Sequence, residues 1–425
     1  MSTLRLVVSA LLIALLGFGC AEPPEFDDTV NPPSEENSEA DEYEPLILIS
    51  IDGVRHDYLD LYDAPTLESL KDESAFVERF VPVFPTKTFP NHYSLVTGLH
   101  PGNHGVISNN MYDDELGRFT MGNDDAVTDG RWWSDGEPIW VTAEQQGQTA
   151  ATYFWPGSEA EIDGTRPSYW TEYDGRIPGE DRVDQVLEWI DLPEDERPDF
   201  ITLYFSKVDS RGHRYGPEAE EVGQALYEVD GYIERLFDGL DERDLHDSAN
   251  VIITSDHGMS PISPDRTILM DEHFDTDDVH ITDYTPVAMI SPKDGVDPQP
   301  IIDTLDALDP IDAYHRDDVP EELHFHGHHR IPEIIAIAQD TWSLSTTPYF
   351  ENNRDRLEGG THGYDPHLDN MQTILMAHGP AFDGQARLDS LNFVDLYPLM
   401  TEIMGLDPAT HDGSLDAGES LLRAR

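Results

Sequence analysis

Six side chains of the kinds that bind divalent metals follow apolar runs or lie in glycine-rich turns of this sequence. They are Asp52, Asp209, His213, Asp256, His257 and His362. Two of them stand four residues apart around a glycine in VDSRGHRYGP, where we expect a loop that folds back, and two adjoin in SDHG. Carboxylate and imidazole groups together suit zinc or a similar ion. Because six ligands exceed the needs of one tetrahedral ion, they predict two metals that share a phosphate group.

Each of these residues has an ordinary explanation when it is taken alone. An aspartate after a strand usually forms a turn, and a histidine in a glycine-rich loop usually lies on the surface. Three acids at strand ends, with three histidines in neighbouring loops, favour a joint site instead. The sequence HFHGHH, residues 324–329, resembles a metal-binding tract, yet we expect a flexible, solvated loop there. We call these residues the histidine tract.

The stretch FPTKTFPNHYSLVTG, residues 84–98, offers hydroxyl groups that a bound metal could activate. A threonine hydroxyl is a weak nucleophile until a base or a metal ion helps to remove its proton. Pro90 suits the first turn of a helix, so Thr88 is expected at a helix N-terminus, where the backbone favours an anion. His92 is expected to be structural. These residues alone leave two readings open, a surface turn before a buried helix or a nucleophile at Thr86 or Thr88.

Apolar runs that end on acids indicate the elements that position these groups. PLILISIDGVR begins at Pro45, DFITLYFSKVDS spans 199–210 and NVIITSDHGM spans 250–259. Near-continuous β-branched runs are typical of parallel strands that are buried on both faces. Segments 180–192 and 221–240 have helical patterns, so we predict an α/β fold, with a mostly parallel central sheet flanked by helices on both faces. Ligands bind beyond the carboxyl ends of such strands, which is where the acids stand.

The charge balance limits the partners of the chain. Its 425 residues carry 86 acidic and 25 basic side chains, for a formal net charge of −61. Repulsion on this scale argues against binding to nucleic-acid duplexes. Acidic side chains spread along the whole chain indicate either adaptation to a saline habitat or a general role in keeping the protein soluble. An anionic substrate would need local positive charge, and bound metal ions are the natural source.

The beginning of the chain has the pattern of an export signal. Residues 1–20 carry Arg5 as their only charged side chain, before an apolar run too short for a comfortable membrane span. Cys20 stands where a lipoprotein is lipidated, which predicts anchoring to a bacterial envelope membrane through that lipid alone. The alternative is a plainly cleaved signal and a periplasmic or secreted protein. Residues 21–44 are predicted to be a disordered acidic linker. Cys20 is the only cysteine, which excludes intrachain disulfides and thiolate metal sites.

Several long motifs in a fixed order carry a resemblance to a known family. They are ISIDGVR, PTKTFPNHYSLVTGLHPGNHGVISNNMYD, GEPIWVTAEQQG, FWPGSEAEIDG, LPEDERPDFITLYF, VDSRGHRYGP, SDHGM, THGYDP and NMQTILMAHGPAF. With them the chain resembles the nucleotide pyrophosphatase/phosphodiesterase family, within the alkaline phosphatase superfamily. The resemblance implies an alkaline-phosphatase-like core and a phosphodiesterase catalytic domain over residues 45–421. We expect an amphipathic helix over 391–406 to close this domain, and no obligate protein partner is evident.

The resemblance implies two Zn²⁺ ions per chain and a role for particular residues. The two ligand groups would be Asp209, His213 and His362 for one ion, and Asp52, Asp256, His257 and Thr88 for the other. Thr88 directly precedes the Phe-Pro-Asn-His run, where the family has its nucleophile. Asn109 stands where the family has an amide that binds a phosphate oxygen. Thr88 would thus attack phosphorus to form a phospho-threonine ester, which water then hydrolyses.

Aromatic residues indicate a nucleotide as the small-molecule substrate. Phe89, Tyr173 and Tyr204 stand where nucleotide-cleaving relatives line a base slot, and Trp155 is nearby in the sequence pattern. Aromatic faces stack on any base, although aromatic side chains beside strands are also common in cores. Lys87 is a candidate contact for substrate charge.

Two departures from the family pattern weaken the transfer of a nucleotide substrate. Asn110 stands where some nucleotide-specific relatives have a lysine near the phosphates, and Glu159 replaces an aspartate. The main hypothesis is an exported nucleotide phosphodiesterase/pyrophosphatase that releases nucleoside 5′-monophosphates. Its alternatives are a lipid-headgroup phosphodiesterase or a phosphomonoesterase of the same superfamily, and an inactive surface module that binds nucleotides or metal. The intact ligand set disfavours the inactive module.

Overall fold

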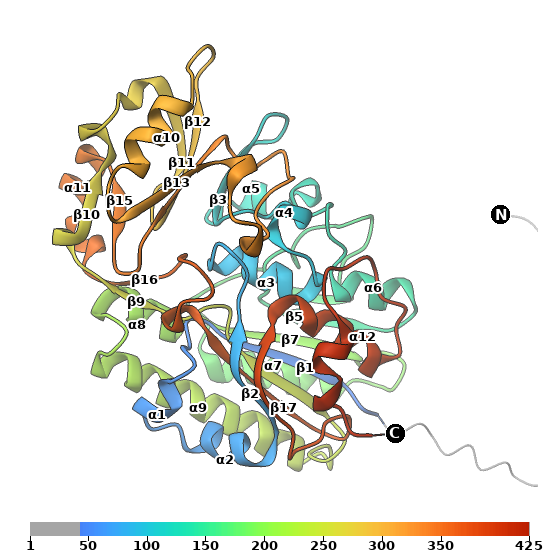
Figure 1. The fold of residues 1–425 in the computed structure, drawn as a ribbon. Coiled ribbons are helices and arrows are strands. Elements are labelled where there is room, and N and C mark those ends of the chain that lie inside the picture. Colours follow the sequence, from blue (N-terminus) through green and yellow to red (C-terminus); the bar gives the residue numbers. More distant parts are fainter. Residues whose placement is uncertain (1–42, 425) are drawn as a thin grey trace, which may run out of the picture. The chain divides into compact units, whose positions relative to one another are not determined.

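An eight-stranded sheet forms the centre of the computed structural model, which describes residues 43–424 (Figure 1). Five central strands run parallel in the order β8-β1-β7-β5-β6, whereas β17 runs antiparallel to both of its neighbours, β8 and β2. The predicted mostly parallel sheet is therefore confirmed. In order across the sheet, the strands are β18 (Arg387–Asn392), β2 (Ala75–Val81), β17 (Thr373–His378), β8 (Asn250–Thr254), β1 (Leu46–Ile51), β7 (Phe200–Phe205), β5 (Ala150–Tyr153) and β6 (Tyr169–Thr171).

The central strands divide their side chains between two hydrophobic cores, one on each face of the sheet. On β1, Leu46 and Leu48 belong to one core, and Ile47 and Ile49 belong to the other, as alternation along a strand requires. Helices cover both cores, as predicted. They are α3 (Thr88–Thr97), α6 (Ile139–Gln145) and α12 (Leu396–Met404) for the first core, and α2 (Pro65–Glu73), α7 (Gly179–Ile190) and α9 (Glu220–Asp241) for the second.

A second, four-stranded antiparallel sheet is inserted between two short strands that pair with each other, β9 (Ser260–Ile262) and β16 (Gly359–Thr361). We call it the insertion sheet, and it has a hydrophobic core of its own. The sequence patterns described above do not indicate this sheet. The insertion sheet and its helix consist of β11 (Val279–Asp283), β12 (Val287–Pro292), β14 (Ile334–Ala338), β13 (Ile311–His315) and α10 (Gln299–Asp306).

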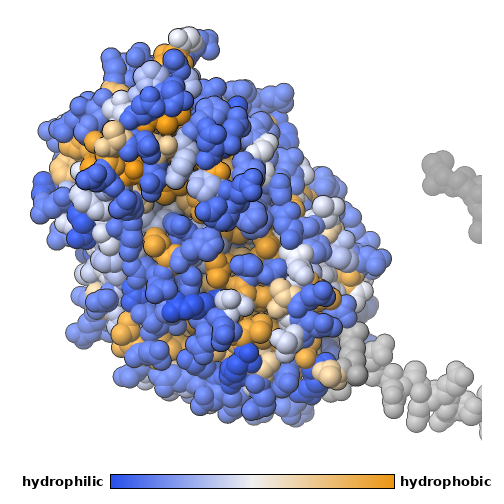
Figure 2. Space-filling model, viewed as in Figure 1, coloured by the Kyte–Doolittle hydropathy of each residue, from blue (hydrophilic) through white to orange (hydrophobic). Residues whose placement is uncertain are grey.

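Short elements complete the described part of the chain. The face drawn in Figure 2 is mostly hydrophilic, in keeping with the large excess of acidic residues. Across residues 43–424 the structure has no helix with both the length and the apolar character needed to span a bilayer. The remaining strands and α-helices are β3 (Asn110–Asp113), β4 (Gly117–Thr120), β10 (Thr267–Leu269), β15 (Ser343–Ser345), α1 (Tyr58–Leu61), α4 (Pro101–His104), α5 (Asp124–Val127), α8 (Lys207–Tyr215), α11 (Thr347–Asn353) and α13 (Leu415–Gly418).

Two expected elements differ from those observed. The expected loop VDSRGHRYGP is the helix α8, in which a Cβ on Gly212 would lie 2.9 Å from Met259 Cε. The glycine therefore permits close packing of a helix and does not reverse a loop. The helix expected over 391–406 is shorter, because β18 extends to Asn392 and α12 begins at Leu396. The predicted export signal with Cys20, and the linker up to residue 42, lie outside the described residues.

Candidate active site

The carboxyl ends of three neighbouring parallel strands bring the predicted acidic ligands together. Asp52 directly follows β1, Asp256 and His257 follow β8, and Asp209 lies in the first turn of α8, just after β7. The Asp209 N–H donates to the carbonyl of Asp52 at 3.0 Å. Gly53 has a φ of 78°, and a Cβ there would lie 2.8 Å from Asp209 Cα. Only glycine allows this close approach of α8 to the end of β1.

Three of the predicted histidines present the same nitrogen to this edge. Each of them donates through Nδ1 to a backbone carbonyl, so its Nε2 keeps a free lone pair in the neutral ring. This tautomer suits a metal ligand. The three hydrogen bonds join His213 to Gly360 at 2.9 Å, His257 to Gly258 at 2.9 Å and His362 to Thr86 at 2.8 Å.

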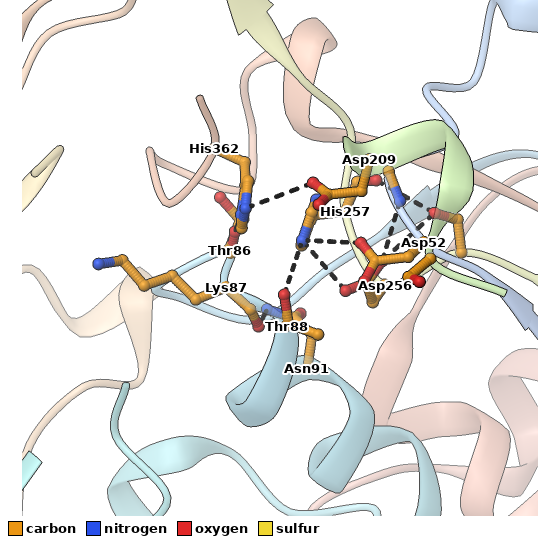
Figure 3. A network of polar contacts seen from close by, with 12 residues as sticks. Asp52, Thr86, Lys87, Thr88, Asn91, Asp209, Asp256, His257 and His362 are labelled. Atoms are coloured by element: carbon orange, nitrogen blue, oxygen red, sulfur yellow. Dashed lines mark hydrogen bonds and ion pairs between the residues drawn. The ribbon is translucent and has the colours of Figure 1, made fainter. Parts of the chain in front are cut away.

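The ligand atoms form two groups that share His257, one with Asp209 and His362 and the other with Asp52 and Asp256 (Figure 3), and His213 adjoins the first. In the first, His362 Nε2 lies 3.1 Å from His213 Nε2 and 3.7 Å from Asp209 Oδ1. His213 Nε2 is 3.2 Å from the same Asp209 oxygen. The His257 ring stacks on that of His362, with their centroids 3.4 Å apart, and so belongs to this group as well.

The second group surrounds His257. Its Nε2 lies 3.4 Å from Asp52 Oδ1, 3.1 Å from Asp256 Oδ2 and 3.4 Å from Thr88 Oγ1. The family resemblance implies these four residues as one ligand group, and their polar atoms lie together in the structure.

Three carboxylate oxygens of the cluster are buried and make no hydrogen bond within residues 43–424, namely Asp52 Oδ1, Asp209 Oδ1 and Asp256 Oδ2. A buried charge without a hydrogen bond is costly, so such atoms are suited to be ligands of a cation. Burial, with Asp256 and Asp209 nearby, raises the pKa of Asp52 well above its ordinary value. Burial also lowers the pKa of His362 well below its usual range. Crowded carboxylates beside imidazole nitrogens fit the ligands of divalent cations.

The helix α3 begins at Thr88, with its hydroxyl facing the second group (Figure 3). Asn109 Oδ1 accepts a hydrogen bond from the Phe89 N–H at 2.9 Å, which holds the amide beside Thr88 with Nδ2 as its remaining donor. Thr86 is fully buried, and its hydroxyl donates to the carbonyl of Tyr364 at 3.0 Å. The partly exposed Thr88 thus remains the candidate nucleophile, whereas Thr86 supports the backbone.

His92 is buried behind Thr88, in the structural position expected for it. Its Nδ1 donates to the carbonyl of Thr88 at 2.8 Å, and its Nε2 accepts from Ser50 Oγ at 2.9 Å. Burial acts to raise the pKa of Asp256, yet the neighbouring His257 and His92 lower it to about 2. His92 therefore joins the first turn of α3 to the second ligand group.

Two of the expected substrate contacts have other partners in the structure. Lys87 is buried, extends away from the carboxylates in Figure 3, and donates through Nζ to Asp283. Trp155 is 3% exposed and donates through Nε1 to the carbonyl of His92, so neither of its faces is open to a base. Long-range packing thus engages both side chains away from the cluster.

The other aromatic candidates differ in how far they are exposed. Tyr173 is 52% exposed, and its ring centroid lies 6.3 Å from that of Tyr204. Tyr204 is only 8% exposed and donates through its hydroxyl to Asp52 Oδ2, a contact that the sequence did not indicate. Phe89 is partly buried, with its ring 6.0 Å from that of Trp133.

The histidine tract is not simply a solvated loop. Phe325 is fully buried and packs edge-on against Phe84, at 5.2 Å between ring centroids. His328 and His329 contact Asp135 and Asp113, respectively. Neither of the two candidate metal-binding groups found in residues 43–424 contains a histidine of this tract.

Known proteins resemble this chain over most of its length. A venom phosphodiesterase of Crotalus durissus collilineatus is 40% identical over 392 residues, which cover 90% of this chain and 47% of the relative. The chain thus spans about half the length of the snake-venom relatives. A bis(5′-adenosyl)-triphosphatase, ENPP4 of Bos taurus, is 38% identical over 381 residues, which cover 89% of this chain and 82% of the relative.

Solved structures extend the likeness to the fold. Murine ectonucleotide pyrophosphatase/phosphodiesterase 5 matches with a TM-score of 0.84 and 32% identity, over 89% of this chain and 100% of that one. An inactive variant of the same murine protein, in complex with AMP, matches equally well. The family model described as type I phosphodiesterase / nucleotide pyrophosphatase matches residues 46–365. The resemblance seen in the sequence motifs is confirmed, and the chain belongs to the type I phosphodiesterase / nucleotide pyrophosphatase family.

Proposed function

We propose that this chain is a two-zinc nucleotide phosphodiesterase/pyrophosphatase that releases nucleoside 5′-monophosphates. The observation that carries the proposal is the set of three buried, unbonded carboxylate oxygens facing imidazole nitrogens, next to the hydroxyl of Thr88. The zinc ions would be held by Asp209, His213 and His362, and by Asp52, Asp256, His257 and Thr88. When bound, two such ions lower the pKa of a coordinated hydroxyl and neutralise charge on a phosphate group.

Thr88 supplies the attacking oxygen in this proposal. A bond forms between Thr88 Oγ1 and phosphorus while the bond from phosphorus to the leaving oxygen breaks. The product of this step is a nucleotidyl ester of threonine. Water then cleaves the ester, which releases the nucleoside 5′-monophosphate and restores the hydroxyl.

Other side chains orient the reacting groups. Asn109 Nδ2 is placed to donate to a phosphate oxygen, because Oδ1 of the same amide is held by the Phe89 N–H. The N-terminus of α3 adds a dipole that favours the phosphate anion. The hydroxyl of Tyr204 holds one oxygen of Asp52 and leaves the other facing the cluster.

Phe89 and Tyr173 are the aromatic side chains that we propose for contact with the base. Tyr173 has an exposed ring, and Phe89 adjoins the nucleophile in the chain. Stacking tolerates any base, so this slot would accept both purine and pyrimidine nucleotides.

A paired assay tests the proposed function. A nucleotide aryl diester and an aryl phosphomonoester are given to the enzyme, with and without prolonged chelation. We expect the diester to be hydrolysed faster and chelation to abolish its hydrolysis, with recovery on addition of zinc. Faster hydrolysis of the monoester would overturn the diesterase proposal, and full activity after chelation would overturn the metal proposal.

We also propose that the protein is exported, with lipid on Cys20 as its anchor. The pattern of residues 1–20 supports export, and several relatives are venom phosphodiesterases. Mass analysis of the mature N-terminus tests the anchor, since a lipidated Cys20 predicts a diacylglyceryl adduct. An unmodified N-terminus would leave a plainly cleaved signal.

A further inference from the structure

A buried polar cluster outside the proposed metal ligands connects the active site to the insertion sheet. It consists of Lys87, Ser108 and Asp283, and we call it the Asp283 clamp. Lys87 Nζ and Ser108 Oγ both donate to Asp283 Oδ2, each at 2.5 Å, and the Tyr284 N–H donates to Oδ1 at 3.0 Å. Lys87 also donates to the carbonyl of Thr285 at 3.1 Å. All three clamp residues are buried, so these charge-assisted hydrogen bonds are shielded from water.

Two residues of the clamp directly precede groups that the proposed reaction uses. Lys87 precedes Thr88, and Ser108 precedes Asn109. Asp283 is the last residue of β11 in the insertion sheet, whereas Lys87 and Ser108 lie in segments outside that sheet. One carboxylate therefore connects the turn that carries the nucleophile to the loop that carries the amide.

The same lysine also packs against the loop of a proposed metal ligand. Gly363 follows His362 and has a φ of 116°. A Cβ on Gly363 would lie 3.0 Å from Lys87 Cε and 2.7 Å from Pro286 Cδ. This close packing leaves the lysine stem little room to move.

We propose that Asp283 is a positioning residue, which fixes Thr88 and Asn109 relative to each other through Lys87 and Ser108. This inference rests on the proposed function. A buried ion pair is weak evidence for stability, because desolvation of the charges offsets their attraction. Its directional bonds instead hold the two segments in one geometry. A misplacement of reacting groups by about 1 Å can slow an enzyme about 10²-fold.

The test compares Ser108→Ala and Asp283→Asn with two matched controls. Ser343→Ala removes a buried hydroxyl that makes no hydrogen bond within the described residues, and Asp312→Asn changes an exposed acid on β13 of the insertion sheet. Diester kcat and KM, the affinity for AMP by calorimetry, and the midpoint of thermal unfolding are measured for each protein. The controls are expected to match the wild type in kcat, KM and AMP affinity.

We expect each variant of the clamp to change the reaction in its own way. Ser108→Ala releases the Asn109 segment, so it should raise KM and weaken AMP binding about 10-fold, with a smaller effect on kcat. Asp283→Asn releases both segments and should lower kcat about 10²-fold. The double variant should be no slower than Asp283→Asn alone, because both changes act through one carboxylate.

Two results would overturn the positioning role. The first is that the wild type is active and that Ser108→Ala and Asp283→Asn both have the same kcat, KM and AMP affinity as the wild type. The other is a loss of activity that only follows the folded fraction, as a purely structural contact would give. If Asp283→Asn does not fold, the kinetics and AMP affinity of Ser108→Ala, which removes a single hydroxyl, decide whether the positioning role holds. A wild type without diester turnover would refute the proposed function, and the AMP affinity of Ser108→Ala would still decide on the clamp.

Discussion

The candidate metal site and the histidine tract both combine histidines with carboxylates, but they differ in how those charges are paired. In the tract, His329 Nε2 lies 2.9 Å from Asp113 Oδ2, and Arg330 Nε donates to the same oxygen at 2.9 Å. In the site, Asp52 and Asp256 each have a buried oxygen without a hydrogen bond inside the described residues. The protein satisfies the charges beside the tract with its own side chains, whereas the buried oxygens of the site fit the ligands of a cation. The two regions have similar residue types, but they differ in the number of hydrogen bonds that their carboxylate oxygens accept.

One carboxylate of each region, Asp52 in the site and Asp113 beside the tract, has its pKa shifted in the opposite direction from the other. Burial, with two aspartates nearby, raises the pKa of Asp52 well above its usual range. Burial also acts to raise the pKa of Asp113, but hydrogen bonds from Arg330 and His329 lower it strongly. The carboxylate of Asp113 is thus stable as an ion without added metal, and that of Asp52 is not.

Removal of the nucleophile in the site should have the largest effect. Thr88→Ala is expected to lower diester kcat by at least about 10³-fold, because no other hydroxyl takes over its attack. Bound zinc should remain, since six of the proposed ligands are intact. Steady-state kinetics and elemental analysis of the same sample check both parts. Normal turnover by Thr88→Ala would refute its assignment as the nucleophile.

Histidine substitutions in the two regions compare them directly. His362→Ala should reduce bound zinc and slow diester hydrolysis by more than about 10²-fold. Mutation of a residue that only hydrogen-bonds to a metal ligand already lowers affinity or activity by up to about 10²-fold, and His362 is a proposed ligand itself. His326→Ala, in an exposed position of the tract, should leave both within about twofold of the wild type. Equal losses in the two variants would remove the distinction between the regions.

Beside the tract, the buried ion pair between Asp113 and Arg330 should affect stability and not chemistry. Asp113→Asn leaves the Arg330 charge, 3% exposed, without its carboxylate, and should lower the free energy of unfolding by about 3 kcal/mol at pH 7. The folded pKa of Asp113 is lowered, so its contribution is present above its ordinary pKa of about 4 and is lost as the pH falls through the folded value. Urea unfolding at several pH values should therefore show the gap between variant and wild type narrowing in acid. A gap that widened in acid would contradict this pairing.

Removal of His329, the exposed partner of the Asp113 carboxylate, should have the smallest effect on stability. The His329 side chain is 65% exposed, and Arg330 still pairs with Asp113 when the imidazole is removed. His329→Ala should therefore lower the free energy of unfolding by less than about 1 kcal/mol. Urea unfolding measures it, and a larger effect than that of Asp113→Asn would show that the imidazole is the main partner.

The sheet and the position of the ligands were largely predictable from the sequence, because buried parallel strands are apolar throughout and end together. Asp52 and Asp256 each stand right after such a run, so local pattern was sufficient to place them. The partner of Lys87 could not be predicted in this way, since Asp283 lies 196 residues further along the chain. The helix α8 also packs Gly212 against Met259, a contact between segments that are distant in the sequence.

Two successive displacements at phosphorus, the first of them by Thr88, are tested most directly by the stereochemistry of hydrolysis. The substrate is a nucleotide aryl diester made chiral at phosphorus by one sulfur atom, and it is hydrolysed in isotopically labelled water. Each in-line displacement inverts the configuration at phosphorus. A threonine ester intermediate therefore predicts overall retention in the nucleoside monophosphate. Overall inversion would show a single direct attack by water and would contradict the role proposed for Thr88.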